Sequence, residues 1–561
     1  MNRLRTTFCN LLLFASCLPG YIRFRMASRR VRKCQIRNMK RLLRRNRRTE
    51  YGIAHSFESI KDWDAFTRLP LTEYKDYSDS IKNIRRGKSG VLTKDSVQIL
   101  QPTSGSSSAS KLIPHTKASA NQFKSALEAW IADLFIQRPR LFLGTQYWSI
   151  SPATAPDMLD GDKVPVGFLD DAEYFGAQRA ALMNAIMAVP ADLRQAEDME
   201  ANQYITSLFL LRQKNLRLIS VWHPSFLTIL LKVMKTNWTR LLADIREGGI
   251  DAGINIPEKT RKKLQERLCP MPKRSSELMN LDSAGEDVYR QAWPHLQIIS
   301  CWRSGNTDGE IIRLEKFFPG VLIQGKGLLA TEGVVSIPFG TPQKHVCAAT
   351  SHLLEFQDDI GVVHPLWDLE EREQYQVILT TGAGLYRYKL GDRVEVSGFY
   401  GETPCIRFLG RAGMVSDFVG EKLHIEHVDR IVNKICERHF DTPDFAMLFP
   451  SKDGDNLSYR LLVQEKAGCN PDTNAAAACL EAELSKNYHY AHARRIGQLK
   501  AAGVALLGAE AQSMYRELMA RRGAVAGTVK FPSLCSELGI DEYLLGTVDI
   551  QEYSLGNRRC I

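Results

Sequence analysis

Hydrophobic and polar positions along the chain predict strands and helices in alternation. An apolar run at 97–100 has strand character. Beyond it, five residues recur at the spacing of one helix face: Phe123, Leu127, Trp130, Ile131 and Leu134. Later apolar runs predict strands at 321–324, 377–379, 445–449 and 459–463, and helical patterns follow at 475–484 and 509–519. Mixed strands and helices with Gly-Asp turns predict an α/β fold.

Length and composition predict more than one domain. A chain of 561 residues is too long for one compact core, and a polar, Gly-rich stretch at 408–427 marks a change in composition. We therefore predict a large N-terminal domain of mixed sheets and helices at 49–420. A small, mobile α/β domain at 421–561 follows a hinge near Gly420, and a basic helical segment at 1–48 comes first.

The positive charge of the chain is concentrated in that first segment. The net charge is +11, yet residues 1–48 hold 15 Lys and Arg and no Asp or Glu, which leaves 59 basic and 63 acidic residues elsewhere. A nucleic-acid surface on the body of the protein is therefore not expected. Twelve scattered cysteines without a C-x-x-C pair argue against zinc and disulfides and favour a reducing, cytoplasmic compartment.

The first 48 residues have more than one interpretation. Two arginines precede an apolar run at 8–18, as in a secretory leader, but no small-residue cleavage site is evident and many positive charges follow. We favour a packed amphipathic helix, and an interfacial membrane helix stays open. Residues 28–48 predict a second, basic helix with a solvated charged face. Its apolar side consists of Val31, Ile36, Met39, Leu42 and Leu43.

Three short stretches carry candidate chemistry. The sequence T-S-G-S-S-S-A-S-K-L-I-P at 103–114 predicts a small-residue loop between a strand and a helix, in which backbone N–H groups and Lys111 could hold phosphates. Thr331 and Glu332 follow the strand at 321–324, where ligands of α/β domains bind. Asp392 follows Gly391 after a strand. It could be an ordinary turn residue or could accept hydrogen bonds from both ribose hydroxyls.

These motifs, in their order along the chain, resemble those of the adenylate-forming superfamily of acyl ligases. More narrowly, the chain is similar to the Gretchen Hagen auxin-responsive family of acyl acid amido synthetases, in its bacterial form. The resemblance is carried by the stretch at 103–114, by G-K-G-L-L-A-T-E-G at 325–333 and by G-L-Y-R-Y-K-L-G-D-R-V at 384–394. It extends over most of the chain and implies that 49–420 is the adenylate-forming domain.

The resemblance also implies residue roles. The residues that it assigns to ATP or AMP are Ser104, Gly105, Ser106, Ser107, Lys111, Thr331, Tyr388, Asp392 and Arg411. Glu332 would take part in catalysis and face Mg²⁺, while Lys111 and Lys530 would supply positive charge to the reaction. The chain departs from the family at Leu328, where relatives commonly place an adenine-stacking Tyr, and in the loop, where Ser replaces Thr and a second Gly.

The expected activity is ATP-dependent adenylation of a carboxylic acid, followed by transfer of the acyl group to an amine such as an amino acid. The cofactors implied are ATP and Mg²⁺, and the partners are small molecules. Two alternatives stay open: an enzyme that passes the acyl group to coenzyme A, and a membrane-docked nucleotide-binding protein with weak catalysis. The sequence identifies neither the acyl acid nor the acceptor, and it gives no oligomeric state.

Overall fold

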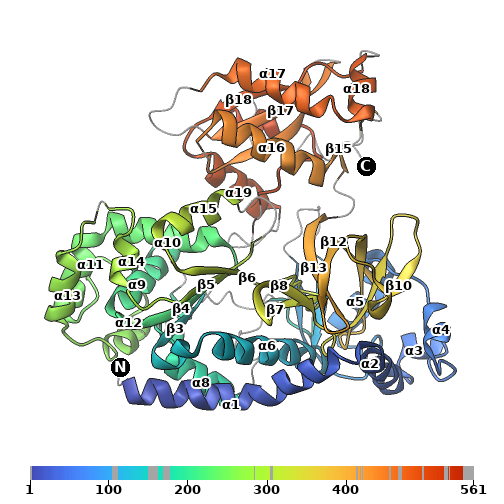
Figure 1. Ribbon diagram of the computed structural model, residues 1–561, viewed down its shortest axis with the longest axis horizontal. Helices are drawn as coiled ribbons and strands as arrows, with labels where there is room; N and C mark the ends of the chain where they lie inside the picture. The colour runs from blue at the N-terminus through green and yellow to red at the C-terminus, as the bar shows by residue number, and fades with distance from the viewer. Residues whose placement is uncertain are drawn as a thin grey trace. The chain divides into compact units, whose positions relative to one another are not determined.

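The computed structural model divides the chain into two compact units. It describes residues 3–103, 111–149, 162–167, 177–196, 198–283, 285–303, 308–411, 415–416, 418–419, 421, 423–441, 443–453, 456–464, 471–495, 498–522, 529 and 531–546. The first unit comprises Met1–Thr103, Lys111–Leu390 and Val394–Phe408. The second comprises Ser104–Ser110, Gly391–Arg393 and Leu409–Ile561. Each unit is considered by itself below, and Figure 1 labels their elements.

Two N-terminal helices belong to the first unit. Helix α1 (Arg3–Ala27) packs along α6 (Lys117–Gln137) and α8 (Ala177–Ile186), and α2 (Val31–Asn46) follows it. Both helices are observed, and α1 is packed as expected, but its exposed side is also apolar, so its predicted amphipathic character is wrong. The inward residues of α1 include Leu13, Cys17 and Phe24. Four of the five residues expected on the apolar side of α2 are buried, and Ile36 is half-buried.

Polar contacts fix both helices to the fold. The Asn10 side chain of α1 donates to the carbonyl oxygens of Phe142 and Gly144, at 3.0 and 2.9 Å, and accepts from Gln146 Nε2 at 3.0 Å. In α2, Gln35 Nε2 donates to the Ala349 carbonyl at 2.7 Å. Because buried polar groups that lose a partner are costly, these bonds make α1 and α2 integral parts of the unit.

A four-stranded sheet with strand order β3-β4-β5-β6 forms one layer of the first unit, and all its pairs are parallel. Its strands are β3 (Thr145–Trp148), β4 (Leu216–Ser220), β5 (Ile298–Cys301) and β6 (Leu322–Gly325). The short helix η2 (Pro139–Leu143) precedes β3. The elements between the strands are α8, η3 (Ala191–Gln195), α9 (Met199–Arg212), α10 (Pro224–Thr236), α11 (Trp238–Glu247), α12 (Glu258–Gln265), α13 (Pro272–Met279), α14 (Val288–Ala292) and α15 (Asp308–Phe317). This alternation is the predicted α/β character.

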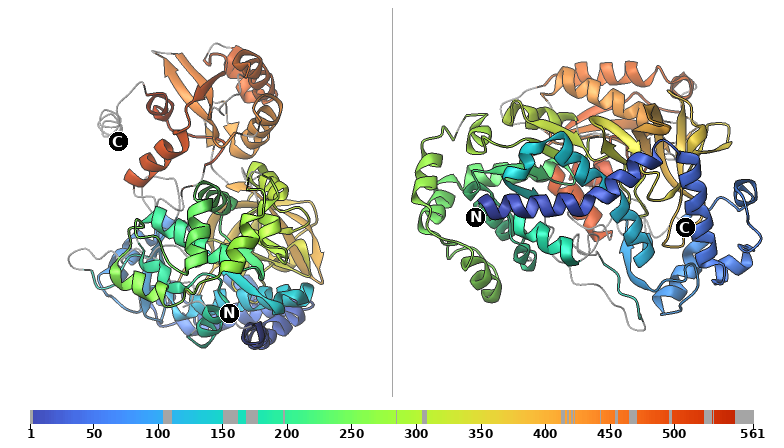
Figure 2. Two further views of the ribbon diagram at one scale, coloured as in Figure 1. Left: turned by 90° about the vertical axis from the view of Figure 1, so that its left-hand side faces the viewer. Right: turned by 60° about the horizontal axis from the view of Figure 1, so that its bottom comes forward.

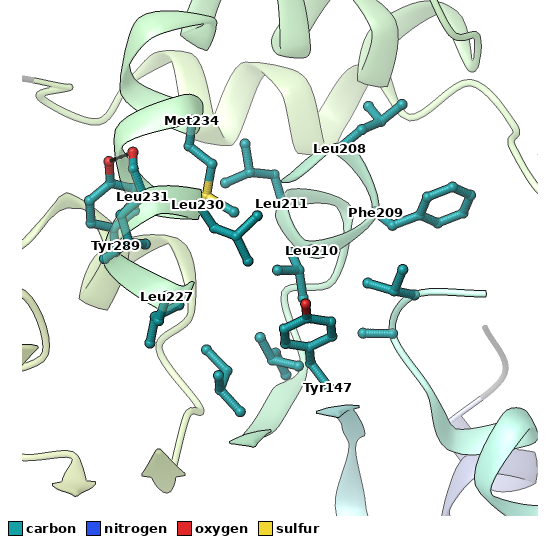
Figure 3. Packing of buried hydrophobic residues seen from close by; sticks show 14 of the residues in the cluster. Tyr147, Leu208, Phe209, Leu210, Leu211, Leu227, Leu230, Leu231, Met234 and Tyr289 are labelled. Carbon is teal, nitrogen blue, oxygen red and sulfur yellow. Dashed lines mark hydrogen bonds between the residues drawn. The ribbon is translucent and has the colours of Figure 1, made fainter. Parts of the chain in front are cut away.

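The core beside this sheet includes aliphatic side chains from α9 and α10. Figure 3 shows Leu210 and Leu211 of α9 near Leu230 and Met234 of α10, and Leu208 farther along α9. These side chains are almost fully buried. Helix α9 is buried around most of its circumference, as expected for a helix that is apolar on nearly all sides.

A seven-stranded sheet has the order β10-β9-β11-β12-β13-β8-β7 and lies in the first unit, apart from residues 391–393 and 409–411. Its strands are β7 (Ser336–Phe339), β8 (Thr341–Cys347), β9 (Leu353–Gln357), β10 (Val363–Pro365), β11 (Gln374–Thr380), β12 (Tyr388–Tyr400) and β13 (Thr403–Arg411). The remaining elements of the unit are α3 (Glu50–Ala54), α4 (Trp63–Thr67), η1 (Tyr74–Tyr77), α5 (Ser78–Arg85), η4 (Leu366–Asp368) and the antiparallel pair β1 (Val97–Pro102) and β2 (Leu112–Thr116).

The second unit is a small α/β domain. Strands β16 (Ala446–Asp453) and β17 (Asn456–Gln464) pair antiparallel, and β18 (Gly503–Leu507) adds in parallel to β17. The other elements of the unit are β14 (Val415–Ser416), β15 (Leu423–His424), α16 (Ile425–His439), α17 (Thr473–Leu484), α18 (Tyr488–Arg495), α19 (Ala511–Arg521) and α20 (Ile540–Leu544). The predicted strands at 445–449 and 459–463 and the helices at 475–484 and 509–519 are confirmed.

A buried ion pair ties the seven-stranded sheet to the N-terminal elements. Arg387 Nη2 lies 2.9 Å from Glu355 Oε1, and both side chains are at most 5% exposed. The guanidinium also donates to the carbonyls of Thr67 and Leu69, although Arg387 has a positive φ of 47°. A positive φ is unfavourable for a residue with a long side chain, so these contacts hold the backbone in that conformation. Arg387, the first of the two arginines in the 384–394 motif, is therefore a structural residue.

We predict that Glu355→Gln strongly destabilises the first unit, because it leaves the Arg387 charge buried without its carboxylate. The expected loss is about 3–5 kcal/mol in the free energy of unfolding measured with urea. The matched control is Arg407→Met, which removes an exposed partner of Glu395 and should cost at most about 1 kcal/mol. Equal losses in the two variants would contradict the structural role of Arg387.

Candidate active site

The carboxyl ends of the four parallel strands meet at one edge of their sheet. Strand β3 ends at Trp148, β4 at Ser220, β5 at Cys301 and β6 at Gly325. Ligands of α/β domains bind at this edge, because loops leave it in diverging directions and open space between them. The chain continues from β6 through the motif at 325–333, so the two residues expected after this strand lie in the loop that leaves this edge.

A lysine that sequence reasoning missed is the most distinctive group at this edge. The ammonium of Lys326 donates to Ser220 Oγ at 2.6 Å, and its side chain is 6% exposed. The nitrogen lies 5.0 Å from the ring centroid of Trp130, 5.7 Å from that of Trp148 and 5.6 Å from that of Trp222. Indole faces attract cations, so this cage holds a positive charge in place.

The three rings of the cage differ in exposure. Trp222 is 50% exposed and Trp148 is half-buried, whereas Trp130 is buried and donates from Nε1 to Gln324 at 3.1 Å. A fixed cation beside partly exposed indole rings matches a ligand with an anionic group and an apolar body. The one sequence feature that could have indicated this site is a lysine between two glycines, directly after a buried strand. The tryptophans come from three other parts of the chain.

Thr331 and Glu332 occupy a tight turn. Ala330 and Gly333 exchange two backbone hydrogen bonds, of 3.0 and 3.1 Å, so Thr331 and Glu332 are the two central residues between them. The neighbouring Leu329 and Val334 form an antiparallel bridge. Thr331 is half-buried and Glu332 is 4% exposed, so the expected carboxylate lies in the interior, unlike an ordinary surface turn residue.

A buried histidine supports this turn. A Cβ atom on Gly333 would lie 2.9 Å from His352 Nε2, so a larger residue would require the imidazole to move. The Nδ1 atom of His352 is 2.8 Å from Ser351 Oγ and 3.4 Å from the Val334 amide nitrogen. Burial lowers the pKa of His352 to about 3, because the imidazolium would lose its hydration. The ring is therefore neutral in the folded protein at neutral pH.

The loop at 103–114 differs from the expected strand–loop–helix unit. Its residues 104–110, including Ser104, Gly105, Ser106 and Ser107, lie outside the described part of the chain. The loop connects β1 to the antiparallel strand β2, and α6 begins only at Lys117. The short run Leu112–Thr116 contains Pro114 and gave no strand signal in the sequence. Lys111 is half-buried, with its ammonium 6.0 Å from the Tyr74 ring centroid.

The 384–394 motif lies largely within a strand. Asp392 is 8% exposed inside β12, which contradicts its interpretation as a turn residue. Gly391 before it has a φ of +84°, a conformation that glycine adopts within an irregular strand without steric cost. Tyr388 is fully buried in a core cluster that also contains Leu328, so packing alone accounts for its burial.

The other expected residues stay predictions. Arg411 ends β13, and its side chain lies outside the described part of the chain, as do Gly420 and Lys530. Among the described residues, no group of three or more His, Cys, Asp and Glu side chains could hold a metal ion. A Mg²⁺ ion could therefore bind to the described residues only through one carboxylate, with phosphate oxygens and water as its other ligands.

Comparisons with known proteins define the class of the fold. The structure of the GH3.15 acyl acid amido synthetase superposes with a TM-score of 0.79 at 19% identity, over 93% of each chain. A structure of the same synthetase in complex with 2,4-DB gives a TM-score of 0.81 at 18% identity, over 96% of each chain. This chain therefore has the same fold as that synthetase.

Sequence comparison gives the family. The GH3 family N-terminal domain matches residues 21–323, the central domain 351–411 and the C-terminal domain 426–538. The chain belongs to the GH3 family. The indole-3-acetic acid-amido synthetase GH3.3 of Arabidopsis thaliana is 22% identical over 551 residues, 92% of this chain and 91% of its own. The probable indole-3-acetic acid-amido synthetase GH3.12 of Oryza sativa subsp. japonica is 24% identical over 436 residues, 70% of this chain and 71% of its own.

We predict that His352 makes the first unit acid-sensitive. Below pH 6.5 the unfolded chain binds a proton at this histidine that the folded chain does not bind, so stability decreases as the pH falls toward the folded pKa of about 3. The loss is about 1.4 kcal/mol per pH unit, or about 2 kcal/mol between pH 6.5 and pH 5.

The variant His352→Gln should lose less stability than the parent between pH 7 and pH 5 in urea unfolding, because it has no imidazole to protonate. The control His489→Gln, at an exposed position of α18, should follow the parent. Parallel stability curves for His352→Gln and the parent would show that His352 does not cause the acid sensitivity.

Proposed function

We propose that the protein is an ATP-dependent acyl acid amido synthetase. It activates a carboxylic acid as an acyl adenylate and transfers the acyl group to the amine of an amino acid. The observation that carries this proposal is that all three GH3 domains match the chain in order. The buried carboxylate of Glu332, in the loop after β6, supports it. The similar relatives named as indole-3-acetic acid-amido synthetases support the same reaction class.

The reaction requires alignment and charge neutralisation instead of a protein nucleophile. The carboxylate oxygen attacks the α-phosphorus of ATP, which displaces pyrophosphate and gives the acyl adenylate. The amine then attacks the acyl carbon, loses a proton, and releases AMP. Bound Mg²⁺ would neutralise phosphate charge in the first step. We assign Glu332 to hold the metal and Thr331 to face the α-phosphate.

The remaining nucleotide contacts follow the family resemblance. We assign Ser104, Gly105, Ser106, Ser107 and Lys111 to the phosphates of ATP, and we assign Asp392 to the ribose. Arg411 would lie near ribose or phosphate, and Lys530 would act when the small domain at 421–561 closes about the hinge near Gly420. Leu328 is 3% exposed and belongs to a core cluster, so a substitute for the adenine-stacking Tyr must come from another residue. We expect the enzyme to be cytoplasmic.

The cage around Lys326 suggests where the carboxylic acid binds. We assign the ammonium to the substrate carboxylate and the exposed indole ring of Trp222 to its apolar body. Attraction between the Lys326 ammonium and the substrate carboxylate would bring the carboxylate to the sheet edge where the loop with Glu332 begins. The acid is therefore expected to be apolar beyond its carboxylate.

We predict that Glu332→Gln abolishes adenylation, because the amide keeps the shape of the side chain but cannot neutralise the metal. Loss of one preorganised charge-stabilising group costs about 10²–10³ in rate. The measurement is pyrophosphate release across a library of carboxylic acids, with amino acids, with coenzyme A and with neither acceptor. Unchanged release by the variant would contradict the assignment. Product formation with coenzyme A but not with amino acids would favour the thioester alternative.

We predict that Lys326→Met raises the KM for the carboxylic acid by about ten- to a hundredfold, with a smaller effect on the KM for ATP. A hydrogen bond to a charged group contributes about 1.5–3 kcal/mol, and methionine keeps the length of the side chain without its charge. Titration of the acid at saturating ATP measures the effect. The exposed Lys344 of β8, as Lys344→Met, is the control. An unchanged KM for the acid would make the cage purely structural.

A further inference from the structure

Helix α1 exposes a continuous apolar stripe on the side that faces away from the core. The large residues of the stripe are Leu4, Phe8, Leu11, Leu12, Ile22 and Met26, which are between 41% and 79% exposed. With the exposed Ala15 and Pro19, positions 4, 8, 11, 15, 19, 22 and 26 lie three or four residues apart and so share one side of the helix. The opposite side, with Leu13, Cys17 and Phe24, is buried against α6. At 1.5 Å per residue, the stripe from Leu4 to Met26 is about 33 Å long.

A helix that is apolar on both sides normally has both sides covered. By length and composition α1 could cross a membrane, with 28% of its apolar window buried. Spanning is inconsistent with its place in the fold, because the buried Asn10 and the half-buried Ser16 are tied to neighbouring segments by side-chain hydrogen bonds. Ser16 Oγ accepts from Arg179 Nε at 3.0 Å. The stripe therefore needs a covering surface while α1 stays docked.

Basic residues lie at both ends of the stripe. Arg3, Arg5 and Arg25 of α1 are exposed, and no Asp or Glu occurs in residues 1–48. Helix α2 adds a basic face that lines a surface hollow of about 430 Å³, formed by Lys33, Ile36, Arg37, Lys40, Arg41 and Arg44. Within the described part of the chain, these five cations form no ion pair. Figure 2 (right) shows α1 and α2 on the same side of the first unit.

We propose that this surface, the apolar stripe of α1 with the basic face of α2, docks the protein on an anionic membrane. Apolar side chains would enter the boundary between headgroups and acyl chains, and the α2 cations would contact lipid phosphates and carboxylates. A second copy of the chain is a poor partner, because two surfaces that carry only positive charge would repel each other. A nucleic acid would satisfy the cations but leave the stripe exposed.

The test is co-sedimentation of the full chain with phosphatidylcholine vesicles, with and without phosphatidylserine. We expect binding that needs phosphatidylserine and weakens with salt. The triple variant Arg37→Gln, Lys40→Gln, Arg44→Gln should bind roughly a hundredfold more weakly, at about fivefold per basic residue near the surface. The charge-matched control is Lys259→Gln, Lys262→Gln, Lys273→Gln, at exposed positions on α12 and α13, which should bind like the parent.

The stripe is tested separately with Leu4→Ser, Phe8→Ser, Ile22→Ser, which should reduce binding at least tenfold while the midpoint of urea unfolding stays unchanged. The control Ile53→Ser, Ile360→Ser, Val362→Ser changes exposed apolar residues elsewhere in the first unit and should have no effect. If the first stripe variant unfolds, the double variant Ile22→Ser, Met26→Ser replaces it in the vesicle-binding measurement. Undiminished vesicle binding by the stripe variants would overturn the proposal. So would a dimer, seen by analytical ultracentrifugation, that the stripe variants dissociate.

Discussion

The parallel arrangement of β3 to β6 is the constraint on which the candidate active site depends. Parallel strands end at the same edge, so residues distant in sequence are brought together there without any local signal. Trp148, Ser220 and Lys326 meet in this way. The loop that leaves β6 then forms the turn that contains Glu332, with Gly333 against His352. A change in strand order or register would separate these groups even if each residue were retained.

The sequence predicted the elements with strong periodicity. Helices α6, α17 and α19 and strands β6, β11, β16 and β17 were expected close to where they lie, because their burial patterns repeat over several residues. The burial of Glu332 could be expected only from its position after a strand. The structural role of Arg387 could not be predicted from the sequence, because its partner Glu355 lies 32 residues away on strand β9.

Two features could not be predicted from the sequence, for different physical reasons. Strand β2 is five residues long and contains a proline, so its pairing with β1 decides its conformation more than its own propensity does. The tryptophan cage is a tertiary arrangement, and nothing in the spacing of Trp130, Trp148 and Trp222 indicates that one ammonium lies near all three. For α1, in contrast, the apolar run was clear, but only the packed structure shows which side remains exposed.

The central claim is that a carboxylate attacks the α-phosphorus of ATP before its acyl group reaches an amine. It is tested most directly by supplying a carboxylic acid labelled with ¹⁸O in its carboxylate, together with ATP and amino acids, and analysing the products by mass spectrometry. The account predicts one labelled oxygen in AMP, unlabelled pyrophosphate and an amide product. Label in inorganic phosphate with formation of ADP would mean attack at the γ-phosphorus and would contradict the account.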